Sequence, residues 1–202
     1  MINLVGMGPG HIDYLTRNAI EIITSADRCI AFGRIAETAR QITSHVTTIT
    51  KLDEIARLLK HKGSIAVLAS GDACFFGILD FLKRKQIIIS RIIPGLTSFQ
   101  YMMSQLQMSW QDTMFFSLHG KTQNYYDILN SELSVILTDK SNTPNNISQK
   151  LFEIGGSGKI YAGFDLSYET ETILEKRSEM PPPIFPICQQ SSLKSKHLML
   201  PD

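Results

Sequence analysis

Short apolar runs alternate with segments of helical periodicity along the first half of the chain. Continuous apolar runs such as residues 2–5 and 64–69 are typical of strands that a parallel sheet buries on both faces. Apolar residues spaced three and four apart predict amphipathic helices between them, the first capped by Asp13. The expected strands are 2–5, 27–32, 46–49, 64–69 and 87–93, and the expected helices are 14–24, 52–60, 75–85 and 97–106. Such alternation is typical of βαβ units with right-handed crossovers.

The second half of the chain is less regular. A polar stretch at residues 107–113, around the only tryptophan, Trp110, predicts a boundary between domains 1–110 and 111–202. The expected strands there are 114–118, 134–137, 159–163, 172–175 and 184–188, with a helix at 147–154. The fold class expected is therefore α/β, with a mostly parallel sheet in the amino-terminal domain and a mixed sheet in the carboxyl-terminal domain.

Composition narrows the function classes. The 202 residues carry a net charge of +1, which argues against a nucleic-acid binder that works by global electrostatics. No window reaches the roughly 18 consecutive apolar residues of a membrane span, and no secretory signal precedes the first strand. The three cysteines are widely separated, as expected of free thiols in a reducing cytoplasm. The five histidines show no paired ligand spacing, so no metal site is expected.

Polar and glycine-rich turns follow three of the expected strands. They are residues 6–10, 71–72 and 94–98, and the carboxyl ends of parallel strands meet at one edge, where α/β sheets bind ligands. Asp72 would offer a carboxylate to an amine or a ribose hydroxyl at that edge. The alternative is that these are ordinary turns, with Asp72 and Thr97 capping helices.

Several nucleotide and hydrolase motifs are absent. A dinucleotide fingerprint needs glycine where His11 stands, and Pro9 removes a backbone donor. Residues 156–159 lack the rest of a phosphate-binding loop, and G-x-S-x-G does not occur. His119 and Lys121 follow an expected strand, where they form either a solvated loop or an anchor for an anionic substrate.

Four segments, in this order and spacing, resemble the tetrapyrrole methylases, which are S-adenosylmethionine-dependent enzymes of corrin, sirohaem and related pathways. They read VGMGPGHIDYLT, ASGDACFFG, PGLTSFQYMMSQLQMSWQDTMFFSLHGK and DLSYETE. The third segment resembles in particular the C5-methyltransferases of cobalamin biosynthesis, which act on precorrin-6Y or cobalt-precorrin-7. The resemblance implies two α/β domains with the cofactor in the cleft between them, in a cytoplasmic homodimer.

The resemblance also implies site residues by position. Those expected to hold S-adenosylmethionine are Pro9, Gly71, Asp72, Phe75, Thr97 and Ser98 in the first domain and Leu137, Thr138 and Leu166 in the second. His119 and Lys121 match the family's HG(R/K) element, and we expect them to hold carboxylates of the tetrapyrrole substrate. No residue is indicated as the proton acceptor. The companion C15 methylation and decarboxylation would come from a separate polypeptide.

The chain departs from the family pattern at three places. The usual GDP reads Gly71-Asp72-Ala73, so the turn loses proline rigidity; His11 replaces an acidic residue, and E-N-L reads Phe164-Asp165-Leu166. The open alternatives are methylation at another tetrapyrrole position, an RNA-modifying or diphthamide-type relative, or a binding protein without turnover.

Overall fold

The computed structural model describes residues 1–60, 62–118, 124–178 and 197–201. The chain forms two compact units, Met1–Ser98 and Phe99–Asp202, each described by itself below. The helix that starts at Ser98 therefore goes almost entirely with the second unit, and the division falls earlier in the chain than the expected boundary after residue 110. The expected strand at residues 184–188 lies outside the described residues.

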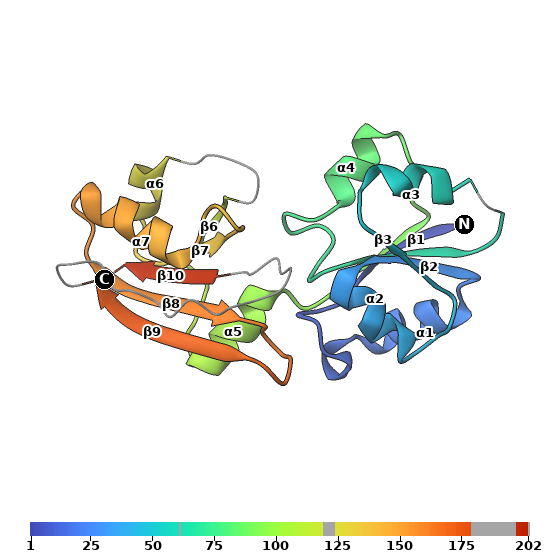
Figure 1. Cartoon of the computed structure of the whole chain (residues 1–202), viewed down its shortest axis with the longest axis horizontal. Coiled ribbons are helices and arrows are strands. Elements are labelled where there is room, and N and C mark those ends of the chain that lie inside the picture. The colour runs from blue at the N-terminus through green and yellow to red at the C-terminus, as the bar shows by residue number, and fades with distance from the viewer. Residues whose placement is uncertain (61, 119–123, 179–196, 202) are drawn as a thin grey trace. The chain divides into compact units, whose positions relative to one another are not determined.

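The first unit is built on a parallel sheet of five strands (Figure 1). In spatial order they are β3 (Val46–Ile49), β2 (Arg28–Phe32), β4 (Ile65–Ala69), β1 (Ile2–Gly6) and β5 (Arg91–Ile93). Leu4 of β1 lies opposite Val67 on one side and Ile92 on the other. The five strands and their parallel arrangement are those expected from the apolar runs.

Helices cover both faces of this sheet, because side chains alternate along the buried strands. Val5 and Leu68 pack beneath α1 (Arg17–Ser25) and α2 (Gly33–Arg40). Leu4 and Val67 face α3 (Asp53–Leu58) and α4 (Leu79–Arg84) instead. The chain leaves β1 toward β2 and leaves β4 toward β5, in opposite directions. The carboxyl ends of β4 and β1 therefore flank a topological switch point, where such sheets bind ligands.

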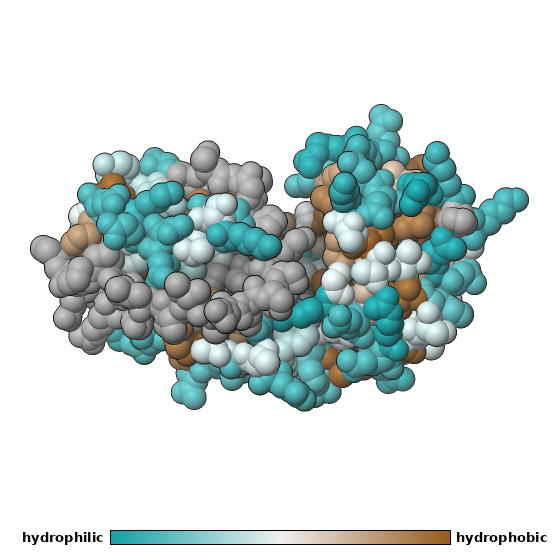
Figure 2. Space-filling model, in the orientation of Figure 1, coloured by the Kyte–Doolittle hydropathy of each residue, from teal (hydrophilic) through white to brown (hydrophobic). Residues whose placement is uncertain are grey.

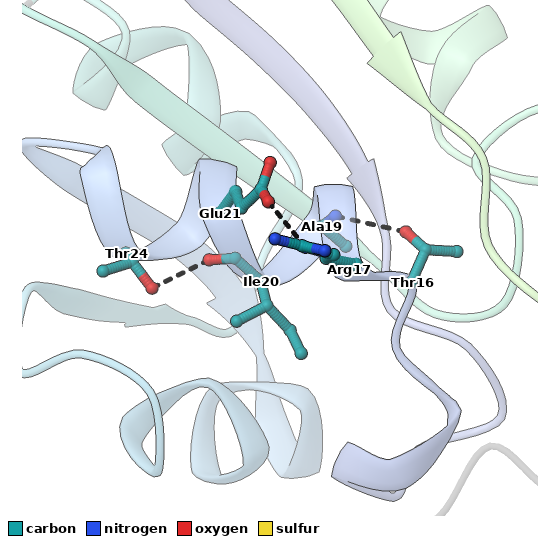
Figure 3. A network of polar contacts seen from close by, with 6 residues as sticks. All are labelled: Thr16, Arg17, Ala19, Ile20, Glu21 and Thr24. Atoms are coloured by element: carbon teal, nitrogen blue, oxygen red, sulfur yellow. Dashed lines mark hydrogen bonds and ion pairs between the residues drawn. The ribbon is translucent and has the colours of Figure 1, made fainter.

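The first helix begins three residues later than expected. The hydroxyl oxygen of Thr16 accepts a hydrogen bond from the backbone N–H of Ala19 at 3.1 Å and caps α1 (Figure 3). Asp13 is not the cap: it lies in a 3-10 turn, η1 (Ile12–Tyr14), capped by His11. The Thr16 hydroxyl satisfies an amide that would otherwise lack a partner, so the helix starts there.

Polar contacts continue along the exposed side of α1. Arg17 Nε lies 3.1 Å from Glu21 Oε1, one helical turn further on, and the Thr24 hydroxyl donates to the carbonyl of Ile20 at 2.8 Å (Figure 3). An exposed pair of this kind contributes about 0.3–0.5 kcal/mol. The helix is held in place mainly by its buried apolar face.

Two elements are shorter than expected, and one helix was not expected. Helix α4 starts only at Leu79, because residues 72–78 form a tight loop. Strand β5 has three residues, since Ile87 and Ile89 pack into the core beneath α3 and α4. Helix α2 begins at Gly33, directly after a strand.

The second unit holds a mixed sheet of five strands. In spatial order they are β6 (Met114–Ser117), β7 (Ser134–Leu137), β10 (His197–Pro201), β8 (Gly158–Phe164) and β9 (Thr172–Ser178). Strands β6 and β7 are parallel, whereas β10 is antiparallel to both β7 and β8. Strands β7 and β8 therefore run in the same direction. The expectation of a mixed sheet is confirmed.

Helices also cover both faces of the second sheet. On one face, Ile128 of α6 (Tyr125–Leu129) and Ile147 of α7 (Pro144–Glu153) share a core with Ile136 and Ile160. On the other face, α5 (Ser98–Leu106) lies so close to β8 that a Cβ on Gly163 would be 2.8 Å from the sulfur of Met102.

Hydrophilic side chains cover much of the visible surface of the first unit, with apolar residues exposed between them (Figure 2). Among the described residues, none of the helices combines the length and apolar character needed to cross a membrane.

Candidate functional site

The turns after β4, β1 and β5 lie side by side, because these three strands are parallel neighbours. The Met7 N–H donates to the Ala69 carbonyl at 2.8 Å. One step further, Gly8 and Gly71 exchange two backbone hydrogen bonds, of 3.3 and 2.8 Å. The glycine turns therefore gather at one edge of the sheet, as the sequence predicts.

The turns pack against one another through bare backbone. A Cβ on Gly6 would lie 2.5 Å from the amide nitrogen of Gly95 and 2.8 Å from the carbonyl oxygen of Gly71. A Cβ on Gly95 would strike that same Gly71 oxygen and the backbone of Gly6. Contact among the three turns is thus sufficient to require Gly6 and Gly95, whether or not a ligand approaches this edge.

The carboxylate of Asp72 joins two of these turns. Oδ1 accepts a hydrogen bond from the Cys74 N–H at 2.7 Å, and Oδ2 accepts one from the Gly95 N–H at 3.1 Å. The first bond closes a turn within residues 72–74, well before α4 begins at Leu79. The second ties the turn after β4 to the turn after β5. Asp72 therefore stabilises the arrangement of the edge.

The remaining residues expected at this edge differ in exposure. Pro9 is buried in the turn after β1. Thr97 and Ser98 are each 5% exposed, at the start of α5. Phe75 is half-buried, and its ring meets that of Phe76 edge-on, with centroids 4.8 Å apart. The edge thus presents backbone, buried hydroxyls and aromatic rings.

In the second unit, three expected residues also lie at one edge of a sheet. Leu137 ends β7, Thr138 follows it, and Leu166 follows β8. Because β7 and β8 run in the same direction, these residues lie at the same edge. Thr138 is 2% exposed, and the Leu137 carbonyl accepts from the Leu118 N–H at 2.8 Å.

Leu166 lies between two residues with left-handed backbone, Asp165 at φ +47° and Ser167 at φ +72°. Left-handed non-glycine residues cost free energy and cluster at functional sites. Side chains hold this turn: the Thr170 hydroxyl donates to Asp165 Oδ2 at 3.1 Å, and Glu171 Oε2 accepts from the Ser167 N–H at 2.6 Å. Sequence reasoning selected Leu166 but missed the turn that positions it. The tolerance of aspartate for left-handed backbone was the available signal.

His119 and Lys121, the expected substrate anchors, lie outside the described residues, so their role stays a prediction.

Cysteine and metal chemistry find no support at these edges. Burial raises the pKa of the Cys29 thiol to about 11, and burial together with Asp72 raises the pKa of Cys74. A raised pKa keeps both thiols protonated at neutral pH, and the thiolate is the reactive form. In the part of the chain that the structure describes, no three His, Cys, Asp or Glu side chains are grouped to hold a metal ion.

Two α/β units, one with a parallel sheet and glycine turns at a switch point and one with a mixed sheet, define a two-unit α/β protein with a ligand-binding edge in its first sheet. The model of the tetrapyrrole (corrin/porphyrin) methylases matches residues 1–180, and the chain belongs to this family.

Named relatives narrow the comparison. The chain is 33% identical to a probable cobalt-precorrin-7 C(5)-methyltransferase of Methanocaldococcus jannaschii, over 86% of this chain and 87% of that protein. It superposes on a precorrin-6Y methylase from Archaeoglobus fulgidus with a TM-score of 0.72 and 21% identity, covering 100% of this chain and 98% of the other. A uroporphyrin-III C-methyltransferase from Thermus thermophilus, complexed with S-adenosylhomocysteine, gives 0.69 and 21%, with 87% of each chain covered.

Proposed function

We propose that this chain is an S-adenosylmethionine-dependent C-methyltransferase of cobalamin biosynthesis. Its substrate would be a corrin precursor, cobalt-precorrin-7 or precorrin-6Y, methylated at C5. The observation that carries the proposal is the 33% identity to a probable cobalt-precorrin-7 C(5)-methyltransferase over most of both chains. Membership of the tetrapyrrole methylases supports the substrate class.

The proposed cofactor is S-adenosylmethionine, and the described residues fit it. In the first unit, the edge offers backbone groups of Gly71 and the buried hydroxyls of Thr97 and Ser98 to a polar ligand. In the second unit, Thr138 offers a further buried hydroxyl. The residues proposed to hold the cofactor are Pro9, Gly71, Asp72, Phe75, Thr97, Ser98, Leu137, Thr138 and Leu166. The carboxylate oxygens of Asp72 each keep a second lone pair for a ligand, beside the two amides they already accept.

The mechanism asks little covalent chemistry of the protein. When bound, the cofactor supplies a methyl group on a sulfonium, whose leaving group is already activated. The protein has to align the ring carbon with that methyl group and exclude water, and positioning of this kind contributes roughly 7–11 kcal/mol. Edges built from backbone and hydroxyl groups, with thiols held neutral, suit a positioning role.

The substrate is a polycarboxylate, and we propose that His119 and Lys121 bind its carboxylates. The homodimer, the cytoplasmic location and the separate polypeptide for C15 methylation and decarboxylation belong to the same proposal and are supported by the family resemblance alone. The residue that accepts a proton from the macrocycle is not assigned.

Two measurements test the proposal. Calorimetry with S-adenosylmethionine and S-adenosylhomocysteine should show binding of both, and binding of neither would refute the enzyme assignment. Incubation with cobalt-precorrin-7 or precorrin-6Y and 13C-methyl cofactor should then give a product whose labelled methyl group lies on C5 by NMR. A label on another carbon would refute the regiochemistry and leave the class intact.

A further inference from the structure

Phe76 combines two unfavourable features. Its backbone has φ +47°, a left-handed conformation in which bulky residues are outliers. Its side chain is 48% exposed, although its neighbour Phe75 is half-buried. An aromatic residue normally contributes to stability by being buried, and this one is held strained and largely in solvent.

The surrounding loop holds Phe76 in this conformation. On its amino-terminal side, the Asp72 carboxylate and carbonyl accept from the N–H groups of Cys74 at 2.7 Å and Phe75 at 3.3 Å. On its carboxyl-terminal side, the Leu79 N–H donates to the carbonyl of Ala73 at 3.3 Å, and a Cβ on Gly77 would strike that same oxygen. The chain thus turns within a few residues, and Phe76 lies at the turn with its ring outward.

The loop follows β4 at the carboxyl edge of the first sheet. Gly71, five residues before Phe76, is bonded to Gly8 at the switch point between β4 and β1. The Asp72 carboxylate also ties the start of the loop to the turn after β5 through Gly95. An exposed aromatic ring is therefore fixed next to the edge at which such sheets bind ligands.

We propose that the ring of Phe76 is a stacking platform for the conjugated face of the tetrapyrrole substrate. This inference rests on the proposed function and adds to it a substrate-binding residue outside the nine proposed for the cofactor. Aromatic rings bind flat conjugated systems through their faces, and such stacking tolerates differences in ring substituents. Carboxylate anchors select the charged rim of the macrocycle, whereas Phe76 would bind its apolar face and set the tilt of the ring.

Three variants separate stacking from a structural role. Phe76→Gly removes the ring and suits the left-handed backbone, so its unfolding midpoint should be equal to or above that of the unmodified protein. Phe76→Tyr keeps a ring. Ile88→Ala is the matched control, because Ile88 is 85% exposed but precedes β5 at the opposite edge of the same sheet.

In steady-state methylation, Phe76→Gly should raise KM for the corrin precursor about five- to tenfold, as loss of one stacking contact predicts. Its dissociation constant for S-adenosylhomocysteine should stay within about twofold of the unmodified value, since stacking adds no cofactor contact. Phe76→Tyr and Ile88→Ala should leave KM unchanged. In parallel, cobyrinic acid, a stable corrin polyacid, should quench the fluorescence of Trp110 with the same order of affinities across the variants.

An unchanged KM and an unchanged cobyrinic acid affinity in Phe76→Gly would overturn the platform. So would a Phe76→Tyr variant as impaired as Phe76→Gly, or an equal loss of S-adenosylhomocysteine binding, which would point to disturbance of the cofactor turns. Failure of the proposed function is distinct, because the unmodified protein would then fail to bind S-adenosylhomocysteine or to methylate C5. The cobyrinic acid titration still decides the stacking in that case, and absence of binding to the unmodified protein counts against it.

Discussion

The two units build their candidate binding edges by opposite means. In the first, Gly6 and Gly95 lack the Cβ atoms that would collide, and the turns after three strands pack as bare backbone. In the second, non-glycine residues at 165 and 167 take left-handed backbone and are held there by the side chains of Thr170 and Glu171. One edge gains its shape by omitting atoms, and the other gains it by paired side chains.

This difference has consequences for tolerance to mutation. An added methyl group in the first edge meets backbone, which cannot rotate away, so the strain spreads through several turns. A lost side chain in the second edge removes one or two hydrogen bonds and frees a turn to relax. We therefore expect substitutions to be costly in the first edge and graded in the second.

The largest effect is expected from Gly95→Ala. The new Cβ would collide with the Gly71 carbonyl and the Gly6 backbone, and overpacking against backbone should lower the free energy of unfolding by about 3 kcal/mol. Denaturant titration measures this. Gly33→Ala is the control, because its φ of +41° is left-handed but no atom lies within 4 Å, and it should cost only about 1–2 kcal/mol. Equal costs at the two positions would show that collision is not the cause.

The next effect is on ligand affinity. Asp72→Ala removes the acceptor of the Cys74 and Gly95 amides and any bond to the cofactor, and it should weaken S-adenosylmethionine binding by about 1–3 kcal/mol in calorimetry. Asp80→Ala, which removes an exposed carboxylate from α4, should leave affinity unchanged. Unchanged affinity in Asp72→Ala would remove this residue from the site.

In the second edge, Asp165→Ala should lower the free energy of unfolding by about 1–2 kcal/mol, because the bond from Thr170 is lost and alanine tolerates left-handed backbone poorly. Asp165→Asn keeps an acceptor and suits the backbone, so it should lose less. Thermal unfolding followed by circular dichroism compares the two. A larger loss in the asparagine variant would contradict a turn held by its acceptor.

The smallest effect is expected from Ser167→Gly. Glycine adopts φ +72° without steric cost, so stability should rise, or stay level, within about 1 kcal/mol. The reciprocal change, Gly155→Ser at φ +91° in open space, should lower stability by a similar amount. A clear loss in Ser167→Gly would mean that the serine side chain itself supports the turn.

Much of the first unit could be predicted from the sequence. Apolar runs identified all five strands of its sheet, since strands buried on both faces need no polar positions. Helix α2 was missed because Gly33 at the end of a strand predicts a stop, yet the helix starts on it. The 87–93 run was too long as a strand, because apolar residues that pack beneath helices look the same as residues that pair.

The candidate site divides in the same way. Turns with glycine at strand ends are visible in a sequence, so the meeting of the turns at Gly8, Gly71 and Gly95 could be expected. The bond from the Gly95 amide to Asp72 joins segments distant in sequence and has no local pattern. The strain at Phe76 arises from the loop around it and is equally invisible until the backbone is known.

Strand β10 has a consequence for synthesis on the ribosome. It lies between β7 and β8, pairing His197 with Ile136 and Leu198 with Tyr161, so the centre of the second sheet is supplied last. The first unit can fold while the ribosome is still translating the rest. Until β10 emerges, β7 and β8 have unpaired edges open to other chains. Nascent second units should therefore be the species that depends most on chaperones.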